Sequence, residues 1–314
     1  MNTQVKHILD EIKKVMIGKD DKIARVLMAL LAQGHILIED VPGVGKTTLA
    51  LAFSKAIGLD YNRTQFTPDI VPSDIVGFSM YNKDTGKFEY RQGAVICNLF
   101  LADEINRTSS KTQSALLEVM EEGQTTVDGV SHKLPQPFIV IATQNPAGTA
   151  GTQLLPSAQL DRFMVKMEMG YPDFEGQVEI LRDRQLENPI EHIREAAKRK
   201  DILSMQQQVK EVHAAEEILT YITRLAVASR QHTMVSLGIS PRGALAVLRM
   251  AKARAFMEGR DYVIPQDVQE IFVDVCSHRL VLNSKAKISD KNGADVLREV
   301  LETVQIEADM QEKK

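Results

Sequence analysis

Hydrophobic positions in the first half of the chain follow two different periods. Residues about 3 to 33 carry apolar side chains at helical spacing, which predicts two helices separated by a loop near residues 17–21. Five short apolar runs of strand length follow, with helical patterns between several of them: 35–39, 62–66, 98–102, 138–142 and 164–168. Strands that alternate with helices indicate a parallel sheet with helices on its faces, so the predicted fold class is α/β.

Two segments interrupt this alternation and have the pattern of β-hairpins. Residues 78–81 and 87–90 flank a polar cluster that ends in Gly86. Residues 125–127 and 130–132 flank Asp128-Gly129, which is typical of a two-residue type I′ turn. The apolar side chains of the first hairpin either form a contact surface or only pack the hairpin onto its own domain: Phe78, Met80, Tyr81, Phe88 and Tyr90.

The chain becomes polar and helical after Tyr171-Pro172-Asp173, and no strand-like run of comparable strength follows. Helix-start signals recur at Pro189, Ser240-Pro241 and Pro265. We therefore predict a domain boundary near residue 171, with an α/β domain at 1–170 and a smaller helical domain at 171–314.

Composition narrows the class of protein. Hydrophobic residues make up 44% and charged residues 25%, as in folded globular proteins, and the net charge of -4 argues against extensive phosphate contacts with nucleic acid. Cys97 and Cys276 lack the spacing of a disulfide framework or a zinc site. No apolar run reaches signal-peptide or membrane-spanning length, so we expect a cytoplasmic protein without membrane insertion.

A glycine-containing loop follows the first predicted strand and opens a helical run. Gly43 and Gly45 allow backbone N–H groups to turn inward around an anion. Lys46 would reach the β- and γ-phosphates of ATP, and Thr47 would ligate Mg²⁺. One departure is Asp40, because the GxxxxGK[ST] pattern expects glycine there. The predicted nucleotide contacts are Pro42, Gly43, Val44, Gly45, Lys46, Thr47 and Thr48.

An acidic pair follows the third predicted strand. Asp103 and Glu104 stand at its carboxyl end, where parallel sheets bind ligands. Asp103 can hold the Mg²⁺ shell, and Glu104 can polarise the attacking water. With the loop upstream, this pair predicts a Mg²⁺-dependent ATPase.

The chain resembles an AAA+ ATPase of the MoxR family, in the helix-2-insert branch. Coverage is nearly end to end, and the family often has Asp in place of the first loop glycine. The resemblance implies a three-layer αβα domain with a five-stranded parallel sheet in the order 5-1-4-3-2, followed by a helical lid. The residues that carry it are 39–48, 66–69, 72–75, 101–107, 111–118, 142–146, 160–163 and 240–242.

The resemblance also implies roles for residues outside the loop. Asn145 matches sensor 1, Arg162 the arginine finger donated to a neighbouring subunit, and Arg242 sensor 2, while Ile17 and Gly18 would line the adenine. Plainer interpretations stay open: a turn residue before Pro146 for Asn145, an ion pair with Asp161 for Arg162, and a solvated surface residue for Arg242.

The assembly follows from the finger, and the function is what the family resemblance implies. If Arg162 acts on a neighbour, a monomer cannot complete its own site, so we expect a homo-oligomeric ring, a hexamer as in the family. The expected function is chaperone-like remodelling, maturation or activation of protein complexes, with a protein client or a von Willebrand A-domain partner. Alternatives are a helicase-like motor on nucleic acid, a metal-chelatase-type motor subunit and a regulatory nucleotide switch. The absence of a visible nucleic-acid module or basic tail disfavours the helicase.

Overall fold

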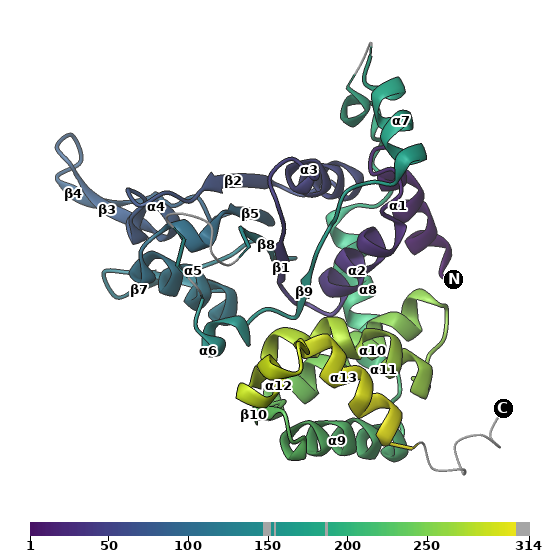
Figure 1. Cartoon of the computed structure of the whole chain (residues 1–314). Helices are drawn as coiled ribbons and strands as arrows, with labels where there is room; N and C mark the ends of the chain where they lie inside the picture. The colour runs from purple at the N-terminus through teal and green to yellow at the C-terminus, as the bar shows by residue number, and fades with distance from the viewer. Residues whose placement is uncertain (147–151, 154, 186–187, 306–314) are drawn as a thin grey trace. The chain divides into compact units, whose positions relative to one another are not determined.

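The computed structural model describes residues 1–146, 152–153, 155–185 and 188–305 (Figure 1). Contacts divide the chain into two compact units. The sheet unit consists of Thr3–Leu155 and Met167–Ser204, and the helical unit consists of Met1–Asn2, Pro156–Lys166 and Met205–Lys314. No helix in the described part of the chain is long and apolar enough to cross a membrane.

A five-stranded sheet forms the centre of the sheet unit, in the order β2-β5-β8-β1-β9. If these five strands alone are numbered 1 to 5 along the chain and read from β9 to β2, this is the predicted order 5-1-4-3-2. Every predicted strand is present. The pairs β1–β8, β5–β8 and β2–β5 are parallel. The strands are β1 (Ile36–Glu39), β2 (Tyr61–Gln65), β5 (Leu99–Asp103), β8 (Ile139–Gln144) and β9 (Val165–Met167).

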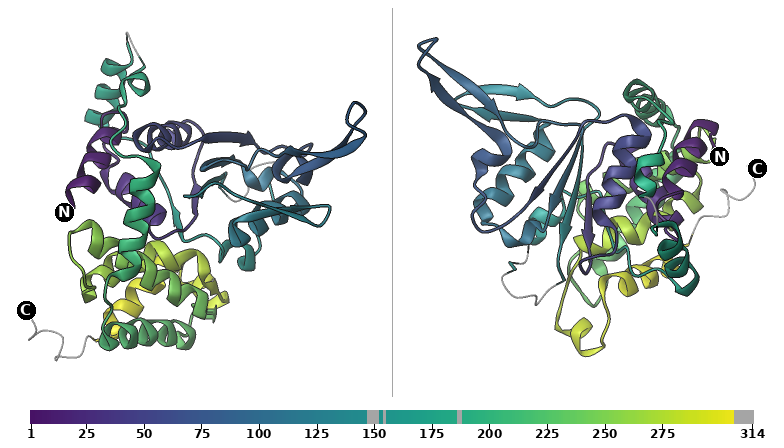
Figure 2. Two further views of the ribbon diagram at one scale, coloured as in Figure 1. Left: turned by 180° about the vertical axis from the view of Figure 1, so that it is seen from behind. Right: turned by 90° about the horizontal axis from the view of Figure 1, so that it is seen from above.

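The aliphatic runs of the central strands are explained by burial on both faces. Every residue of β5 and β8 is buried, whereas the edge strand β2 is largely exposed. Helices lie on both sides of the sheet (Figure 2). The longer helices of this part of the chain are α1 (Thr3–Lys13), α2 (Asp20–Leu31), α3 (Lys46–Ile57) and α5 (Ser110–Glu122), and a short α4 (Pro72–Val76) precedes the first hairpin.

Both predicted hairpins are present and contact each other. The first pairs β3 (Gly77–Asn82) with β4 (Lys87–Gln92), and the second pairs β6 (Gln124–Val127) with β7 (Val130–Lys133). Asp128 and Gly129 have φ of 50° and 78°, the positive values that a type I′ turn requires. The Tyr90 ring stacks on the His132 ring at 3.7 Å, which joins the two hairpins.

The segment after β9 groups with the sheet unit because it is bonded to α3. It contains α7 (Phe174–Asp183) and the 3₁₀ turn η2 (Pro189–His192). The backbone N–H groups of Ala196 and Ala197 both donate to the Ala56 carbonyl, at 2.8 and 3.2 Å. By this grouping the boundary predicted near residue 171 falls inside the sheet unit, and the segment 156–166 belongs with the helices.

The helical unit packs an apolar core that includes Tyr221, Val247, Met250, Ile271 and Phe272. It also holds a two-stranded sheet of β10 (Val235–Leu237) and β11 (Val281–Leu282), which the sequence pattern did not predict because each strand is so short. Its helices are α6 (Ser157–Leu160), the carboxyl-terminal part of α8 (Arg199–Glu211), α9 (Glu216–Gln231), α10 (Pro241–Met257), α11 (Pro265–Cys276), α12 (Ser284–Ile288) and α13 (Gly293–Thr303).

Candidate functional site: a phosphate pocket at the carboxyl edge of the sheet

The loop between β1 and α3 has the backbone of an anion-binding nest. Gly43 and Gly45 have φ of 88° and 93°, in the left-handed region that favours glycine. A Cβ built at Gly43 meets nothing within 4 Å, so backbone conformation rather than crowding requires glycine there. Gly45 is the N-cap of α3, whose first N–H groups and dipole therefore favour an anion at the loop. The Lys46 Nζ donates to the Asp40 and Val41 carbonyls, at 2.7 and 3.1 Å.

A pocket of about 370 Å³ lies over this loop. The loop, the ends of β2 and β5, and Arg184 just beyond α7 surround it. Among the predicted loop residues only Val44 is not in its wall. The lining residues are Pro42, Gly43, Gly45, Lys46, Thr47, Thr48, Arg63, Gln65, Asp103, Glu104 and Arg184.

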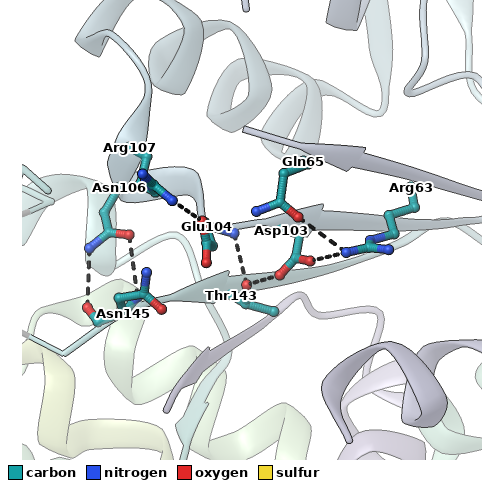
Figure 3. Close-up of polar contacts among 8 residues, drawn as sticks. All are labelled: Arg63, Gln65, Asp103, Glu104, Asn106, Arg107, Thr143 and Asn145. Carbon is teal, nitrogen blue, oxygen red and sulfur yellow. Dashed lines mark hydrogen bonds and ion pairs between the residues drawn. The ribbon is translucent and has the colours of Figure 1, made fainter. Parts of the chain in front are cut away.

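The acidic pair is held by one buried hydroxyl (Figure 3). The Thr143 hydroxyl donates to Asp103 Oδ1 at 2.6 Å and accepts the Glu104 N–H at 2.8 Å. Glu104 has a φ of 57°, which is uncommon for a residue with a Cβ and is typical of functional positions. Arginines bond one further oxygen of each carboxylate: Arg63 bonds Asp103 Oδ2 at 2.7 Å, and Arg107 bonds Glu104 Oε2 at 2.9 Å.

Asn145, just beyond β8, is positioned through its backbone (Figure 3). The Asn106 side chain donates to the Asn145 carbonyl at 3.1 Å and accepts the Asn145 N–H at 3.3 Å. The Asn145 Oδ1 is buried and has no hydrogen-bond partner among the described residues. Leaving such an acceptor unpaired is costly, so this atom suits a donor from water or a ligand.

Asp40, the departure from the usual loop pattern, connects the loop to the segment after β9. Its Oδ2 accepts the N–H groups of Met169 and Gly170, both at 2.7 Å. Lys19 donates to the carbonyls of Met169, Gly170 and Tyr171, at 2.7 to 3.0 Å. A glycine at position 40 could not make these bonds. The segment 169–171 thus links the phosphate loop to the neighbouring loop that holds Ile17 and Gly18.

Ile17 and Gly18, the residues expected at the adenine, do not line the phosphate pocket. They lie between α1 and α2, and Gly18 has a φ of 67°. Ile17 faces the first turn of α7, where a Cβ built at Gly176 would lie 3.7 Å from Ile17 Cγ2. Because Lys19 and Asp40 bind the same three-residue segment, an adenine beside Ile17 stays compatible with phosphates at the loop.

The remaining two predicted residues, Arg162 and Arg242, belong to the helical unit and are connected through Asp161. The Ser240 hydroxyl donates to Asp161 Oδ2 at 3.1 Å and accepts the Gly243 N–H. Ser240 thereby caps α10 two residues before Arg242. The buried Arg279 pairs with the Asp161 carboxylate and donates to the Asp161 and Phe163 carbonyls, both at 2.7 Å. Two neighbouring anchors therefore fix the backbone on both sides of Arg162.

The donor set over the loop suits a magnesium ion. Thr47 offers a hydroxyl and Asp103 a carboxylate, the oxygen ligands that Mg²⁺ prefers. Within the described ranges no three His, Cys, Asp or Glu side chains gather into a metal-binding group. A metal ion here would therefore depend on nucleotide oxygens and water for its other ligands, which is how nucleotide-bound Mg²⁺ is held.

Sequence reasoning missed several residues of this arrangement. Arg63 and Gln65 carry no motif, but their position on the strand beside β5 follows once the strand order is known. Thr143 and Asn106 lay inside segments already singled out, without a role of their own. Arg184 and Arg279 have no sequence signal, because only the packed structure brings them to their partners.

Comparisons with known proteins identify relatives of the chain. Residues 35–165 match the family described as "ATPase family associated with various cellular activities (AAA)", and residues 227–300 match "AAA lid domain". The chain is 47% identical to uncharacterized protein YeaC of Bacillus subtilis, over 95% of this chain and 93% of that protein. It is 39% identical to Chaperone MoxR1 of Mycobacterium tuberculosis, over 94% and 80%. A solved structure from Cytophaga hutchinsonii superposes with a TM-score of 0.89 at 38% identity, covering 96% and 94%.

Proposed function

The chain belongs to the MoxR family of AAA+ ATPases, and on that premise we propose that it couples Mg²⁺-dependent ATP hydrolysis in a homo-oligomeric ring to the remodelling of protein complexes. The observation that carries the hydrolytic part is the Thr143 hydroxyl, which joins Asp103 and Glu104 at the rim of a pocket floored by the phosphate loop. A binding loop alone holds nucleotide, whereas an acidic residue beside it can also direct water.

The residues divide the hydrolytic step between them. Lys46 and the loop N–H groups would hold the β- and γ-phosphates, while Thr47 and Asp103 would hold Mg²⁺, which supplies positive charge against the phosphates when bound. Glu104 accepts a proton from the water whose oxygen bonds to the γ-phosphorus, as the bond to the β-phosphate oxygen breaks. The Asn145 amide orients that water or the γ-phosphate.

Assembly into a ring, with six subunits as the expected number, is supported by an uncovered apolar stripe on α7. Phe174 is 82% exposed and Leu181 61%, and Val178 lies between them at helical spacing, while Tyr171 is exposed three residues before the helix begins. Arg184, one residue beyond this helix, lines the phosphate pocket. A second copy packed on the stripe would therefore lie beside the nucleotide, which is where a donated Arg162 has to act.

The assembly is tested by measuring mass in solution with ATP, in a Glu104→Gln background that retains nucleotide. Phe174→Ser with Leu181→Ser should reduce the large species to monomer, while Glu175→Ser with Arg182→Ser, on the same helix, should leave it intact. Mixing inactive Arg162→Ala with inactive Glu104→Gln should partly restore turnover, because some interfaces then pair an intact acid with an intact finger. A fully active monomer would contradict the shared site.

A protein client is supported by the tip of the first hairpin. Tyr81 and Phe88 face each other across β3 and β4, with ring centroids 5.4 Å apart, and are 52% and 74% exposed. Phe78 and Met80 are exposed on the opposite face. Tyr90 instead packs on His132 and donates to the Val76 carbonyl, so it stabilises the hairpin. Charges of both signs around the tip do not suit a phosphate backbone.

The client is tested by ATPase rate with candidate protein partners, including von Willebrand A-domain proteins, and with single-stranded DNA, duplex DNA and RNA. We expect a protein partner to stimulate the ATPase rate. Phe88→Ala should abolish this stimulation, whereas Lys83→Ala, at the same tip, should preserve it. Strong, salt-sensitive stimulation by nucleic acid alone would instead support a helicase-like motor.

A further inference from the structure

Arg63 is a cation of the phosphate pocket that lies outside the nucleotide-binding loop and both acidic positions. It stands on the edge strand β2, where Gln65 is in register with Asp103 and Arg63 with Leu101. Because side chains alternate along a strand, Arg63, Gln65 and Asp103 share one face of the sheet. The Arg63 Nη2 donates to Asp103 Oδ2 at 2.7 Å and to Gln65 Oε1 at 3.1 Å (Figure 3).

Arg63 occupies Oδ2, the Asp103 oxygen that the Thr143 hydroxyl does not bind. The other oxygen, Oδ1, accepts the buried Thr143 hydroxyl at 2.6 Å. Mg²⁺ at Oδ2 would compete with the guanidinium, because two cations at one oxygen repel each other. The Arg63 side chain is 43% exposed and that of Asp103 only 11%, so the arginine is the partner that can move.

We propose that Arg63 exchanges partners during nucleotide binding: it holds Asp103 Oδ2 while the site lacks metal, and turns to the terminal phosphate oxygens when the metal takes that oxygen. The proposal rests on the function proposed above and adds a phosphate contact from the same chain. Arg63 lines the same pocket as Lys46 and Thr47. Phosphate oxygens bound at the loop would therefore lie in the pocket that Arg63 faces. A planar guanidinium is well suited to pair with phosphate, often through two bonds.

The exchange predicts two effects of opposite sign when Arg63 is replaced. Without the arginine, nothing competes with Mg²⁺ for Asp103, so less Mg²⁺ is needed to saturate the site. In the absence of metal, removing Arg63 leaves the negative charge of Asp103 without its cation, so the carboxylate repels the phosphates of metal-free ATP and the affinity for ATP falls. An ion pair that only holds β2 against β5 predicts something different, since its loss would weaken nucleotide and metal binding together.

The test measures ATP binding by calorimetry in the Glu104→Gln background, first with EDTA and then across a Mg²⁺ titration. For Arg63→Gln we expect about a fivefold weaker affinity for metal-free ATP and a half-saturating Mg²⁺ concentration lowered by about the same factor, as for one partly exposed ionic contact. Arg63→Lys should lie between parent and Arg63→Gln. The control, Arg298→Gln, removes an exposed pair with Asp295 of similar length, 2.8 Å, and should change neither value.

Either effect failing to appear, or a raised Mg²⁺ requirement, would overturn the exchange. Thermal unfolding of each variant shows whether a loss of binding comes from misfolding. If Arg63→Gln misfolds, Arg63→Lys is compared with the parent instead. The outcome is also separable from the proposed function. A parent protein that neither binds nor hydrolyses ATP would contradict that function, whereas an active parent with an Arg63→Gln variant that binds identically would contradict only this inference.

Discussion

Arginines meet carboxylates in both units of the molecule, but the two sets of pairs differ in how completely the carboxylate is enclosed. In the helical unit Asp267 is fully buried, receives Arg254 and Arg260, and also accepts the Ile264 N–H at 2.9 Å. In the sheet unit Asp103 and Glu104 each have a single arginine, Arg63 or Arg107, which is more than 40% exposed. The Asp267 carboxylate is thus enclosed by hydrogen-bond donors, whereas the carboxylates of Asp103 and Glu104 face the phosphate pocket.

This difference separates structural pairs from functional ones. Removing one partner of an enclosed pair leaves a buried charge without compensation, which is strongly destabilising. The partners of such a pair are therefore expected to stay together in one geometry. An exposed arginine can be replaced by water at little cost, so its carboxylate stays available to a ligand. Arg279 is itself buried, although the Asp161 side chain is 23% exposed, and its bonds to the Asp161 and Phe163 carbonyls hold the backbone around Arg162.

The largest expected effect is the loss of turnover in Glu104→Gln. Removing a group that accepts a proton in the transition state costs on the order of 10²- to 10⁴-fold in rate, while the loop that binds phosphate stays intact. Steady-state hydrolysis and ATP binding should therefore separate in this variant. Lys46→Ala is the matched contrast, since it should lose binding itself. Turnover at the parent rate in Glu104→Gln would remove this residue from catalysis.

The next effect is on stability, and it compares the two kinds of pair directly. Asp267→Asn should lower the free energy of unfolding by about 3 kcal/mol, because it leaves two arginines around an uncharged group in a buried site. The hydrogen bond to Asp267 raises the pKa of Arg260, in line with a tightly held pair. Asp103→Asn should cost less than about 1 kcal/mol. Denaturant titration of both variants measures the two free energies of unfolding. Equal losses of stability would contradict the distinction between enclosed and exposed pairs.

A smaller effect is expected from pH. Burial lowers the pKa of His278 from 6.5 to about 3, and its Nε2 lies 3.0 Å from the Phe163 carbonyl beside the Arg279 cluster. Between these values the unfolded chain binds the extra proton, so stability is complete above pH 6.5 and is lost on acidification. The loss between pH 7 and pH 5 should reach at most about 2 kcal/mol. His278→Gln should flatten the stability profile in that window, and an unchanged slope would contradict the assignment.

The smallest of these effects concerns the hydroxyl that joins the acidic pair. Thr143→Val keeps the shape of the side chain but removes both of its hydrogen bonds, so Asp103 and Glu104 lose their common support. We expect turnover to fall about tenfold, the equivalent of one hydrogen bond to a charged group, with ATP affinity nearly unchanged. Thr143→Ser should recover most of the rate. A Val variant as active as the parent would show that the hydroxyl does not position the acids.

The sequence predicted those features that local patterns determine. Strand runs, the two hairpins and the loop around Lys46 each follow from neighbouring residues, and the strand order followed from the family resemblance. Arg63 could not be found in this way, because its partner Asp103 is forty residues away and meets it only when β2 pairs with β5. Asp40 was seen as a departure from a motif, yet its reason lies in the N–H groups of Met169 and Gly170 across the fold.

The most direct test of this account is a crystal structure of Glu104→Gln with ATP and Mg²⁺. The account predicts Mg²⁺ bound to Thr47 and Asp103, and Arg63 moved beyond the roughly 4 Å limit of an ion pair with Asp103. The Asp267 and Asp161 clusters of the helical unit should keep every bond described above. A structure in which Arg63 still bonds Asp103 Oδ2 while the nucleotide and metal are fully bound would contradict the distinction between enclosed and exchangeable pairs.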